Sequence, residues 1–244
     1  NSQISIEQLE SLLIKTKSKE LKSKCHLSLS EIYKELKNSE KMIFHLENSA
    51  KFTKDRTQKS IIYGKLAEIA FNKKNYTSAM KGYKNIISNS LSKEKIENAH
   101  LQILKIMRLE NNYFEAEKKI KSLLLDEKFK NISGNLELEL VQLYRTQGEM
   151  SEIESRLETI VNNYQKTLVS SEAYFQLGQI YSSQKWDLNK AKDYFKQVSK
   201  ENSKSFFVPM ANSRINSIET YQKAEEDLNS YQIMEKRDSN LEKN

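Results

Sequence analysis

Apolar and small side chains recur along this chain at intervals of three and four residues, which is the spacing of one face of an α-helix. The pattern is clearest in two neighbouring stretches that a short polar break separates. Its members are Tyr174, Leu177, Gly178 and Tyr181 in the first stretch and Ala191, Phe195 and Val198 in the second. Because small residues allow helices to approach closely, Gly178 and Ala191 predict an antiparallel pair in tight contact, with aromatic side chains filling the space beside them.

The same pair of helices recurs upstream with a nearly constant period. One position in the second helix of each pair marks the register: Met42, Ala79, Ala116, Ile153 and Ala191. The steps between these residues are 37, 37, 37 and 38. A fixed period of this length is typical of stacked repeats. We expect the repeats at about 20–53, 57–90, 94–127, 134–165 and 170–203.

Helical patterns also flank the repeats at both ends. One helix is expected over 5–17, and it resembles half of a repeat. Another is expected over 208–235, where Pro209 fits the first turn and a polar outer face would cap the last repeat. We therefore expect a single solenoid domain over 1–235 and a polar tail, 236–244, that frays.

The seven residues of the clearest pair resemble the signature of the tetratricopeptide repeat, in which an aromatic residue, Leu-Gly and Tyr are followed by Ala and Phe. The resemblance implies an all-α fold, a right-handed superhelical solenoid of about five antiparallel helix pairs with a half-repeat before them and a capping helix after them. Two features depart from the family pattern. The period exceeds the family's usual length of about 34 residues, and the proline that often closes a family repeat is missing.

In that family the first helix of each repeat lines the concave face, where side chains are free to contact a partner. Helical geometry then places ten candidates for partner binding on that face: Lys34, Phe71, Leu101, Lys105, Arg108, Leu138, Gln142, Arg145, Phe175 and Gln179. A surface that mixes cations with apolar groups suits a peptide or helix of another protein that carries acidic and apolar side chains. The alternative is that some of the apolar residues pack against the next helix and that the cations are merely solvated.

Composition and charge agree with a protein made of thin helical layers. Hydrophobic residues make up 37% of the chain and charged residues 30%, which suits helices that each bury a single stripe. The net charge of +7 fits either solvated lysines on exposed helix faces or an acidic partner. No run of five basic residues occurs, so the diffuse charge argues against nucleic acid as the partner. The longest apolar runs are far too short for a transmembrane helix.

The residue types that carry chemistry are few and scattered. Cys25, His26 and His45 could cluster in the first repeat, but a metal site or a catalytic Cys-His pair would need a further ligand or an orienting group. The five glycines lie far apart, so they form no phosphate-binding loop. We therefore expect no catalytic residues, no metal, no cofactor and no small-molecule substrate, and we predict that the protein is not an enzyme.

The function that these features favour is an adaptor or scaffold that binds another protein. Residues 170–225 also resemble bacterial envelope proteins of this repeat class, which favours a bacterial multiprotein assembly in the periplasm or at a membrane. The chain begins with Asn1 rather than Met, so we expect that an upstream targeting segment or anchor has been removed. Two alternatives stay open, namely a structural protein that self-associates and a regulatory module of an enzyme.

Overall fold

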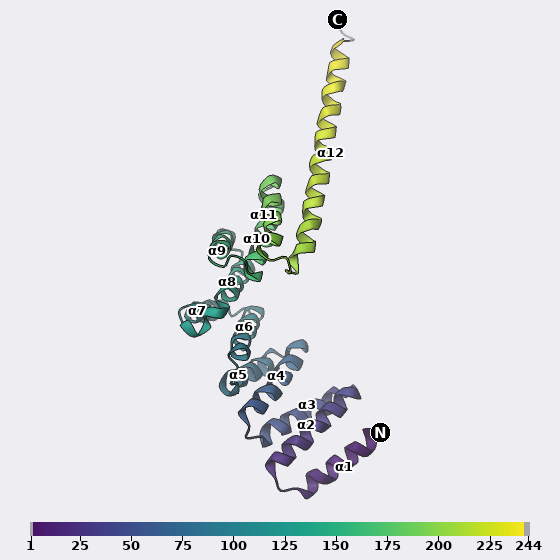
Figure 1. The fold of residues 1–244 in the computed structure, drawn as a ribbon, viewed down its shortest axis with the longest axis vertical. Coiled ribbons are helices and arrows are strands. Elements are labelled where there is room, and N and C mark those ends of the chain that lie inside the picture. The colour runs from purple at the N-terminus through teal and green to yellow at the C-terminus, as the bar shows by residue number, and fades with distance from the viewer. Residues whose placement is uncertain (1, 242–244) are drawn as a thin grey trace. The chain divides into compact units, whose positions relative to one another are not determined.

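The computed structural model describes residues 2–241, and it describes side chains as far as Met234. Within this part of the chain every regular element is helical, with twelve α-helices and one short 3-10 helix (Figure 1). The predicted all-α helical-repeat fold is therefore confirmed. The chain divides into two compact units, Asn1–Ser122 and Leu123–Asn244, and each is described by itself.

The first unit is built from consecutive helices that pack in pairs. Its helices are α1 (Ser2–Lys15), α2 (Lys19–Glu35), α3 (Ser39–Phe52), α4 (Arg56–Asn72), α5 (Tyr76–Asn89), α6 (Lys93–Leu109) and α7 (Tyr113–Leu124), the last of which crosses the unit boundary. The most extensive contacts join α2 to α3 and α4 to α5. Ala67, Ala79, Ile103 and Ile106 belong to one of its apolar cores, which spans α4, α5 and α6.

The second unit repeats this plan and adds a long final helix. Its elements are the 3-10 helix η1 (Glu127–Ile132) and the helices α8 (Ser133–Gln147), α9 (Met150–Asn163), α10 (Leu168–Ser183), α11 (Leu188–Glu201) and α12 (Phe207–Leu241). Here α8 packs on α9, α10 on α11, and α12 on α11. The segment expected to fray, 236–244, is helical as far as Leu241, and residues 242–244 lie outside the described residues.

One turn geometry links the two helices of a repeat. After α2, Lys37 N–H donates to Lys34 O at 3.0 Å and Asn38 N–H donates to Tyr33 O at 2.9 Å. This is the Schellman motif, and its central residue Lys37 is left-handed with φ 54°. Asn38 then caps α3 by accepting from Lys41 N–H at 3.1 Å. The turn therefore satisfies the end of one helix and the start of the next with three residues.

The left-handed residue recurs at the same place in every repeat. It is Lys37, Lys74, Asn111, Gly148 or Trp186, and φ ranges from 52° to 79°. The fifth turn has one residue more, since Asp187 N–H donates to Tyr181 O, six positions back, at 2.9 Å. In the first turn the corresponding bond spans five positions. This extra residue explains why the last repeat step is 38 and not 37.

Close helix contact in the last repeat depends on Gly178. A Cβ atom at this position would lie 2.6 Å from two ring carbons of Phe195, which is itself only 1% exposed. The α10–α11 pair therefore has room for the Phe195 ring only because Gly178 lacks a side chain, as the sequence pattern predicts. Gly64 in α4 is a contrasting helical glycine, because a Cβ there would meet only Ile86 Cδ1, at 3.7 Å.

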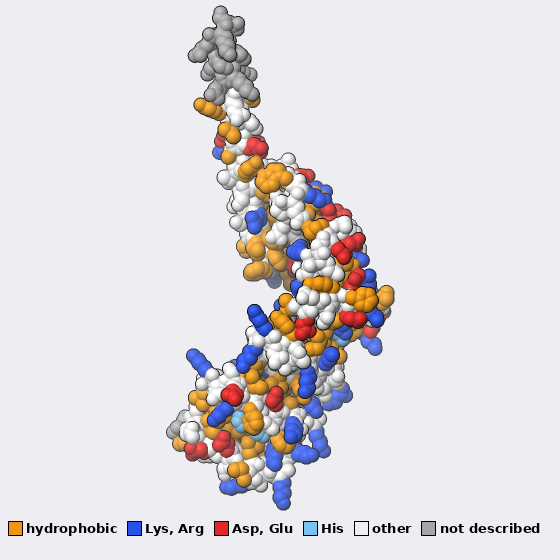
Figure 2. Space-filling view, turned by 180° about the vertical axis from the view of Figure 1, so that it is seen from behind, with side chains coloured by type: hydrophobic (Ala, Val, Ile, Leu, Met, Phe, Trp, Pro, Cys, Tyr) orange, Lys and Arg blue, Asp and Glu red, His pale blue; other side chains and the backbone are white. Residues whose placement is uncertain are grey.

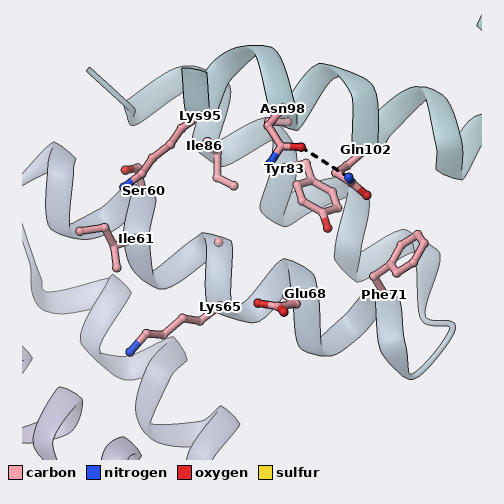
Figure 3. A pocket seen from close by; sticks show the side chains of 12 residues that line it. Ser60, Ile61, Lys65, Glu68, Phe71, Tyr83, Ile86, Lys95, Asn98 and Gln102 are labelled. Atoms are coloured by element: carbon pink, nitrogen blue, oxygen red, sulfur yellow. Dashed lines mark hydrogen bonds between the residues drawn. The ribbon is translucent and has the colours of Figure 1, made fainter. Parts of the chain in front are cut away.

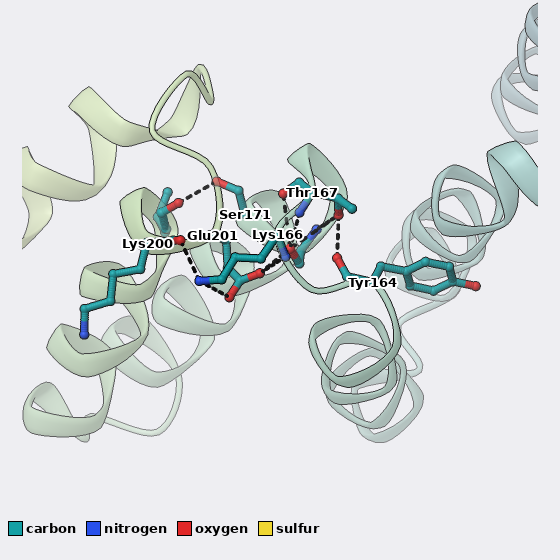
Figure 4. A network of polar contacts seen from close by, with 8 residues as sticks. Tyr164, Lys166, Thr167, Ser171, Lys200 and Glu201 are labelled. Carbon is teal, nitrogen blue, oxygen red and sulfur yellow. Dashed lines mark hydrogen bonds and ion pairs between the residues drawn. The ribbon is translucent and has the colours of Figure 1, made fainter.

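Polar contacts fasten the turn between α9 and α10 to the end of α11 (Figure 4). Glu201 accepts hydrogen bonds from Lys166 N–H at 2.5 Å and from Ser170 Oγ at 2.8 Å. Ser171 Oγ donates to Val198 O at 2.9 Å. Ser23 makes the same contact in the first repeat, where its Oγ donates to Ser49 O at 3.0 Å. In these two repeats, a buried serine thus connects the start of the first helix to the end of its paired helix through a hydrogen bond.

The two glycines provide a matched test of this packing. Gly178→Ala should destabilise the protein by about 1–3 kcal/mol, because the buried Phe195 ring cannot move aside. Gly64→Ala should instead stabilise it by about 0.5–1 kcal/mol, because alanine favours a helix and space is available. Urea denaturation of both variants measures the difference. Equal effects of the two substitutions would contradict the assigned close approach.

The left-handed turns provide a second test. Lys74→Gly should raise the free energy of unfolding by about 0.5–1 kcal/mol, since glycine adopts positive φ without steric cost. Gly148→Ala should lower it by about 1 kcal/mol for the same reason. Thermal denaturation can compare the two variants with the wild type. A stabilised Gly148→Ala variant would rule out the left-handed conformation at that turn.

Candidate partner-binding site

A cleft of about 520 Å³ opens between the first helices of the second and third repeats, α4 and α6 (Figure 3). Both helices present one face to it. The α4 wall consists of Ser60, Ile61, Gly64, Lys65, Glu68 and Phe71, and the α6 wall consists of Lys95, Asn98, Ala99 and Gln102. Tyr83 and Ile86 of α5 form its base. The cleft lies wholly within the first unit, so its geometry does not depend on the second.

The α4 wall is open at its centre because Gly64 has no side chain there. Ile61 and Phe71 lie on either side of that opening, and Glu68 lies on α4 before Phe71 (Figure 3). On the α6 wall, Gln102 Nε2 donates to Asn98 Oδ1 at 3.4 Å. Two side-chain amides therefore line the cleft, and amides can both donate to and accept from a peptide main chain.

The cleft carries charges of both signs, because Glu68 lines it together with Lys65 and Lys95. Lys65 forms an ion pair with Glu31 of α2, and Lys95 is exposed. Lys105 lies beyond the cleft with its Nζ 5.1 Å from the centre of the Phe71 ring, a cation–π contact. Burial, together with the nearby Glu68 carboxylate, raises the pKa of the Tyr83 hydroxyl. Tyr83 is therefore a neutral hydrogen-bonding group at the base of the cleft.

The structure distributes the ten predicted residues unevenly. In the first unit it brings Phe71 and Lys105 together, with Leu101 and Arg108 half-buried on α6 and Lys34 exposed at the end of α2. Lys105 and Arg108 belong to the first unit and Arg145 to the second. Helical geometry in the sequence predicted Phe71 but not Lys95, Asn98 or Gln102, which occupy the neighbouring stripe of α6. A glycine at the centre of the α4 stripe was the available signal for an opening there.

In the second unit, two of the predicted residues serve packing. Phe175 is 3% exposed and its ring contacts Phe195 at 5.6 Å and Phe207 at 5.0 Å between centroids. Leu138 is 8% exposed. The prediction placed both on a free surface, and the structure corrects this, since both are buried and the rings of Phe195 and Phe207 cover Phe175. Gln142 and Gln179 are half-buried.

Arg145 lies at one end of a polar chain that joins α8 to α10. Its guanidinium donates to Gln176 Oε1 at 2.7 Å, and Gln176 Nε2 donates to Glu172 Oε1 at 3.0 Å. Burial lowers the pKa of Arg145 and raises the pKa of the Glu172 carboxyl. Arg145 is therefore engaged within its own unit, although part of the side chain reaches the surface.

The histidines of the first repeat form a buried pair. His26 Nδ1 and His45 Nδ1 lie 3.0 Å apart, so one ring must donate and the other accept. Phe52 stacks on His26 and Tyr33 stacks on His45. Cys25, which precedes His26 in the sequence, is also buried, and burial raises the pKa of its thiol. Among the described residues no group of three metal-ligating side chains is present.

Other repeats carry different residue types at the two positions that correspond to His26 and His45. The equivalents of His26 and His45 are Glu137 and Arg156, an ion pair at 3.5 Å, in the fourth repeat. In the fifth they are Tyr174 and Tyr194, with ring centroids 6.1 Å apart. These pairs join the two helices of a repeat, so we attribute the histidines to packing and not to catalysis.

Comparison with known proteins finds one family model and several structures of similar fold. A family model of the tetratricopeptide repeat matches residues 171–205. BtubC from P. vanneervenii is similar in structure over 83% of this chain and 88% of its own, with a TM-score of 0.53 and 15% identity. PilF from Pseudomonas aeruginosa covers 90% of this chain and 97% of its own, with a TM-score of 0.47 and 10% identity. No curated protein has significant sequence similarity to the chain.

Paired helices with a common turn, repeated in one register, define an all-α helical-repeat protein. The tetratricopeptide-repeat model matches the last helix pair, and the preceding pairs keep the same register. Repeats of this class form protein–protein interaction scaffolds and are generally not catalytic. In the described residues, no helix has both the length and the apolar character needed to cross a membrane.

The histidine pair predicts a pH-dependent stability. Burial lowers the pKa of His26 and of His100 to about 4 and also lowers that of His45, from an ordinary value of 6.5. The unfolded chain then takes up protons first, so stability is complete above pH 6.5 and is lost as the pH falls toward 4. Urea denaturation between these pH values should show this decline.

A variant carrying His26→Tyr and His45→Tyr is the matched control, because it copies the Tyr174–Tyr194 pair of the fifth repeat. It should show a shallower decline, with His100 providing the remainder. An unchanged slope would mean that the histidine pair does not titrate on unfolding.

Proposed function

We propose that this protein is an adaptor that binds a segment of another protein in the cleft between α4 and α6. The observation that carries the proposal is the combination of apolar, amide and basic groups around one opening in a first-helix face. In repeat proteins that face is the usual place for a ligand. Phe71 and Lys105, which helical geometry predicted for this role, lie at one end of the same surface.

The lining of the cleft suggests what such a segment carries. Asn98 and Gln102 can hydrogen-bond to the main chain of an extended peptide. Ile61 and Phe71 offer contacts to apolar side chains. Lys95 and Lys105 would attract acidic side chains. The net charge of +7 likewise favours a negatively charged partner. An acidic segment with apolar side chains at intervals fits this combination best.

A second contact region would lie on α8 and α10, where Gln142, Arg145 and Gln179 remain accessible in part. Leu138 and Phe175 have no place in it because they are buried. We keep Arg145 as a candidate that would exchange its bond to Gln176 for one to a partner carboxylate. No catalytic role is proposed for any residue.

A place in a bacterial envelope assembly is part of the proposal. Its support is the sequence resemblance of residues 170–225 to envelope proteins of this repeat class. A regulatory module of an enzyme is the less favoured alternative, since no group in the described clefts suggests chemistry on a substrate.

Charge reversal on the cleft tests the proposal. The variant Lys95→Glu with Lys105→Glu should weaken binding by about tenfold or more, because the two cations proposed to attract the acidic segment become repulsive. Partner proteins would be captured with the wild-type chain from the source organism and identified by mass spectrometry. Affinities would then be measured by titrating each purified partner.

The matched control is Lys81→Glu with Lys118→Glu. Both lysines are exposed on the second helices α5 and α7, and the change in net charge is identical. This control should bind as the wild type does. Equal losses in both variants would show a nonspecific charge effect, and no loss in either would place the partner elsewhere. Arg145→Glu, measured alongside, reports separately on the second unit.

A further inference from the structure

A second groove in the first unit lies between α5 and α7, the second helices of two neighbouring repeats, and has a volume of about 710 Å³. Its base is formed by His100, Ile103 and Met107 of α6, and its walls include Lys84 of α5 and Lys119 of α7. It shares no lining residue with the cleft between α4 and α6. A role for this groove is therefore independent of the partner site proposed above.

His100 and Lys119 occupy the positions at which three other repeats join their two helices through a side-chain pair. That pair is two hydrogen-bonded histidines in the first repeat, an ion pair in the fourth and two tyrosines in contact in the fifth. In the third repeat it is a histidine and a lysine, so neither member supplies a negative charge. The pair therefore does not balance the charge of Lys119.

Lys84 brings a second positive charge to the same groove. Burial lowers the pKa of Lys119, and the charge of Lys84 lowers it further. Burial and the charge of Lys119 together lower the pKa of His100 to about 4, so its imidazole is neutral at neutral pH. Many Lys and Arg side chains lie on the face of the first unit that Figure 2 shows. Lys119 differs from most of the surface lysines in being half-buried, where a charge interacts more strongly than in open water.

The chain itself does not neutralise these two lysines. Among the described residues, neither Lys84 nor Lys119 takes part in a recorded ion pair. Glu115 also lines the groove, but it is exposed, one turn before Lys119 on α7. The groove thus has a net positive charge that is available to an anion from outside.

Comparison with the preceding repeat shows that the fold does not need these lysines. The equivalent groove lies between α3 and α5, and Glu47 and Gly82 stand there in place of Lys84 and Lys119. A Cβ atom at Gly82 would lie 2.7 Å from Ala67 Cβ, so this position has no room for a side chain. The lysines are therefore a property of one groove and not of the repeat, which favours a ligand as their purpose.

We propose that the groove between α5 and α7 binds a phosphate group, which Lys84 and Lys119 hold between them. A phosphate group carries up to two negative charges at neutral pH and has three strong acceptor oxygens. Cations from two separate helices match this charge, and lysine binds phosphate as a compact point charge. The side-chain amide of Asn112, which also lines the groove, can donate to a further oxygen. Ile103 and Met107 at the base would contact an apolar group attached to the phosphate.

The probe for this site is phenyl phosphate, which joins a phosphate group to an apolar ring. Isothermal titration at a pH of about 7.5 and constant ionic strength should show saturable binding, since the phosphate is then largely doubly charged. Lys84→Gln with Lys119→Gln should weaken this binding by about tenfold or more, because both charge-assisted contacts are lost. A wild-type chain that shows no saturable binding would overturn the proposal.

Lys81→Gln with Lys118→Gln is the matched control, because both lysines are exposed on the same two helices and neither lines the groove. It removes the same net charge and should bind phenyl phosphate as the wild type does. Equal losses in the two double variants would show a general charge effect and would also overturn the proposal. Circular dichroism during thermal denaturation checks that each variant remains folded.

Two further ligands test the chemistry of the group and its source. Benzoate has the same ring with a single negative charge, and it should bind about tenfold more weakly than phenyl phosphate. Equal binding of the two would overturn the assignment to phosphate. Inorganic phosphate that binds as tightly as phenyl phosphate would support the site as one for the free ion. Weaker binding of inorganic phosphate would support it as a site for a phosphate ester whose apolar part contacts the base of the groove.

Discussion

A residue held in the left-handed conformation between paired helices is the constraint on which the repeats of this protein depend. In the first repeat, Lys37 turns the chain so sharply that the next residue, Asn38, both closes α2 and caps α3. The corresponding residues Lys74, Asn111, Gly148 and Trp186 have the same sign of φ. A turn this short leaves the two helices antiparallel and in contact, so the packing between them must tolerate close approach. Small residues such as Gly178 meet that requirement.

Within this fixed frame, the contacts between paired helices vary widely in chemistry. The positions of His26 and His45 are filled by an ion pair, Glu137–Arg156, in one repeat and by two tyrosines in another. Each pair satisfies its own polar or apolar groups across the same gap. The paired helices and their turn therefore set the geometry. The two side chains at these positions set local properties, such as the pH response of His26 and His45. This freedom explains why the repeats share a period but little sequence.

The first unit carries a cleft and the second carries an exposed helical stripe, and these two surfaces differ in kind. The cleft between α4 and α6 is a mixed surface, in which amide and basic groups surround an opening beside Gly64. The stripe on α12, formed by Tyr221, Ala224, Leu228 and Tyr231, is narrow and apolar, and it lies on a part of the helix whose described side chains are mostly exposed. We propose the first as the contact site for another protein.

The sequence by itself determined the helical class, the period of the repeats and the tight contact around Gly178. These features follow from local spacing, because residues three and four positions apart share a helix face whatever lies elsewhere in the chain. Only the tertiary structure decided which first-helix residues remain accessible. Phe175 is covered by Phe207 of α12, and Asn98 and Gln102 line a cleft with α4. Exposure on a first helix depends on which other helices pack beside it, and the spacing of residues within that helix does not reveal this.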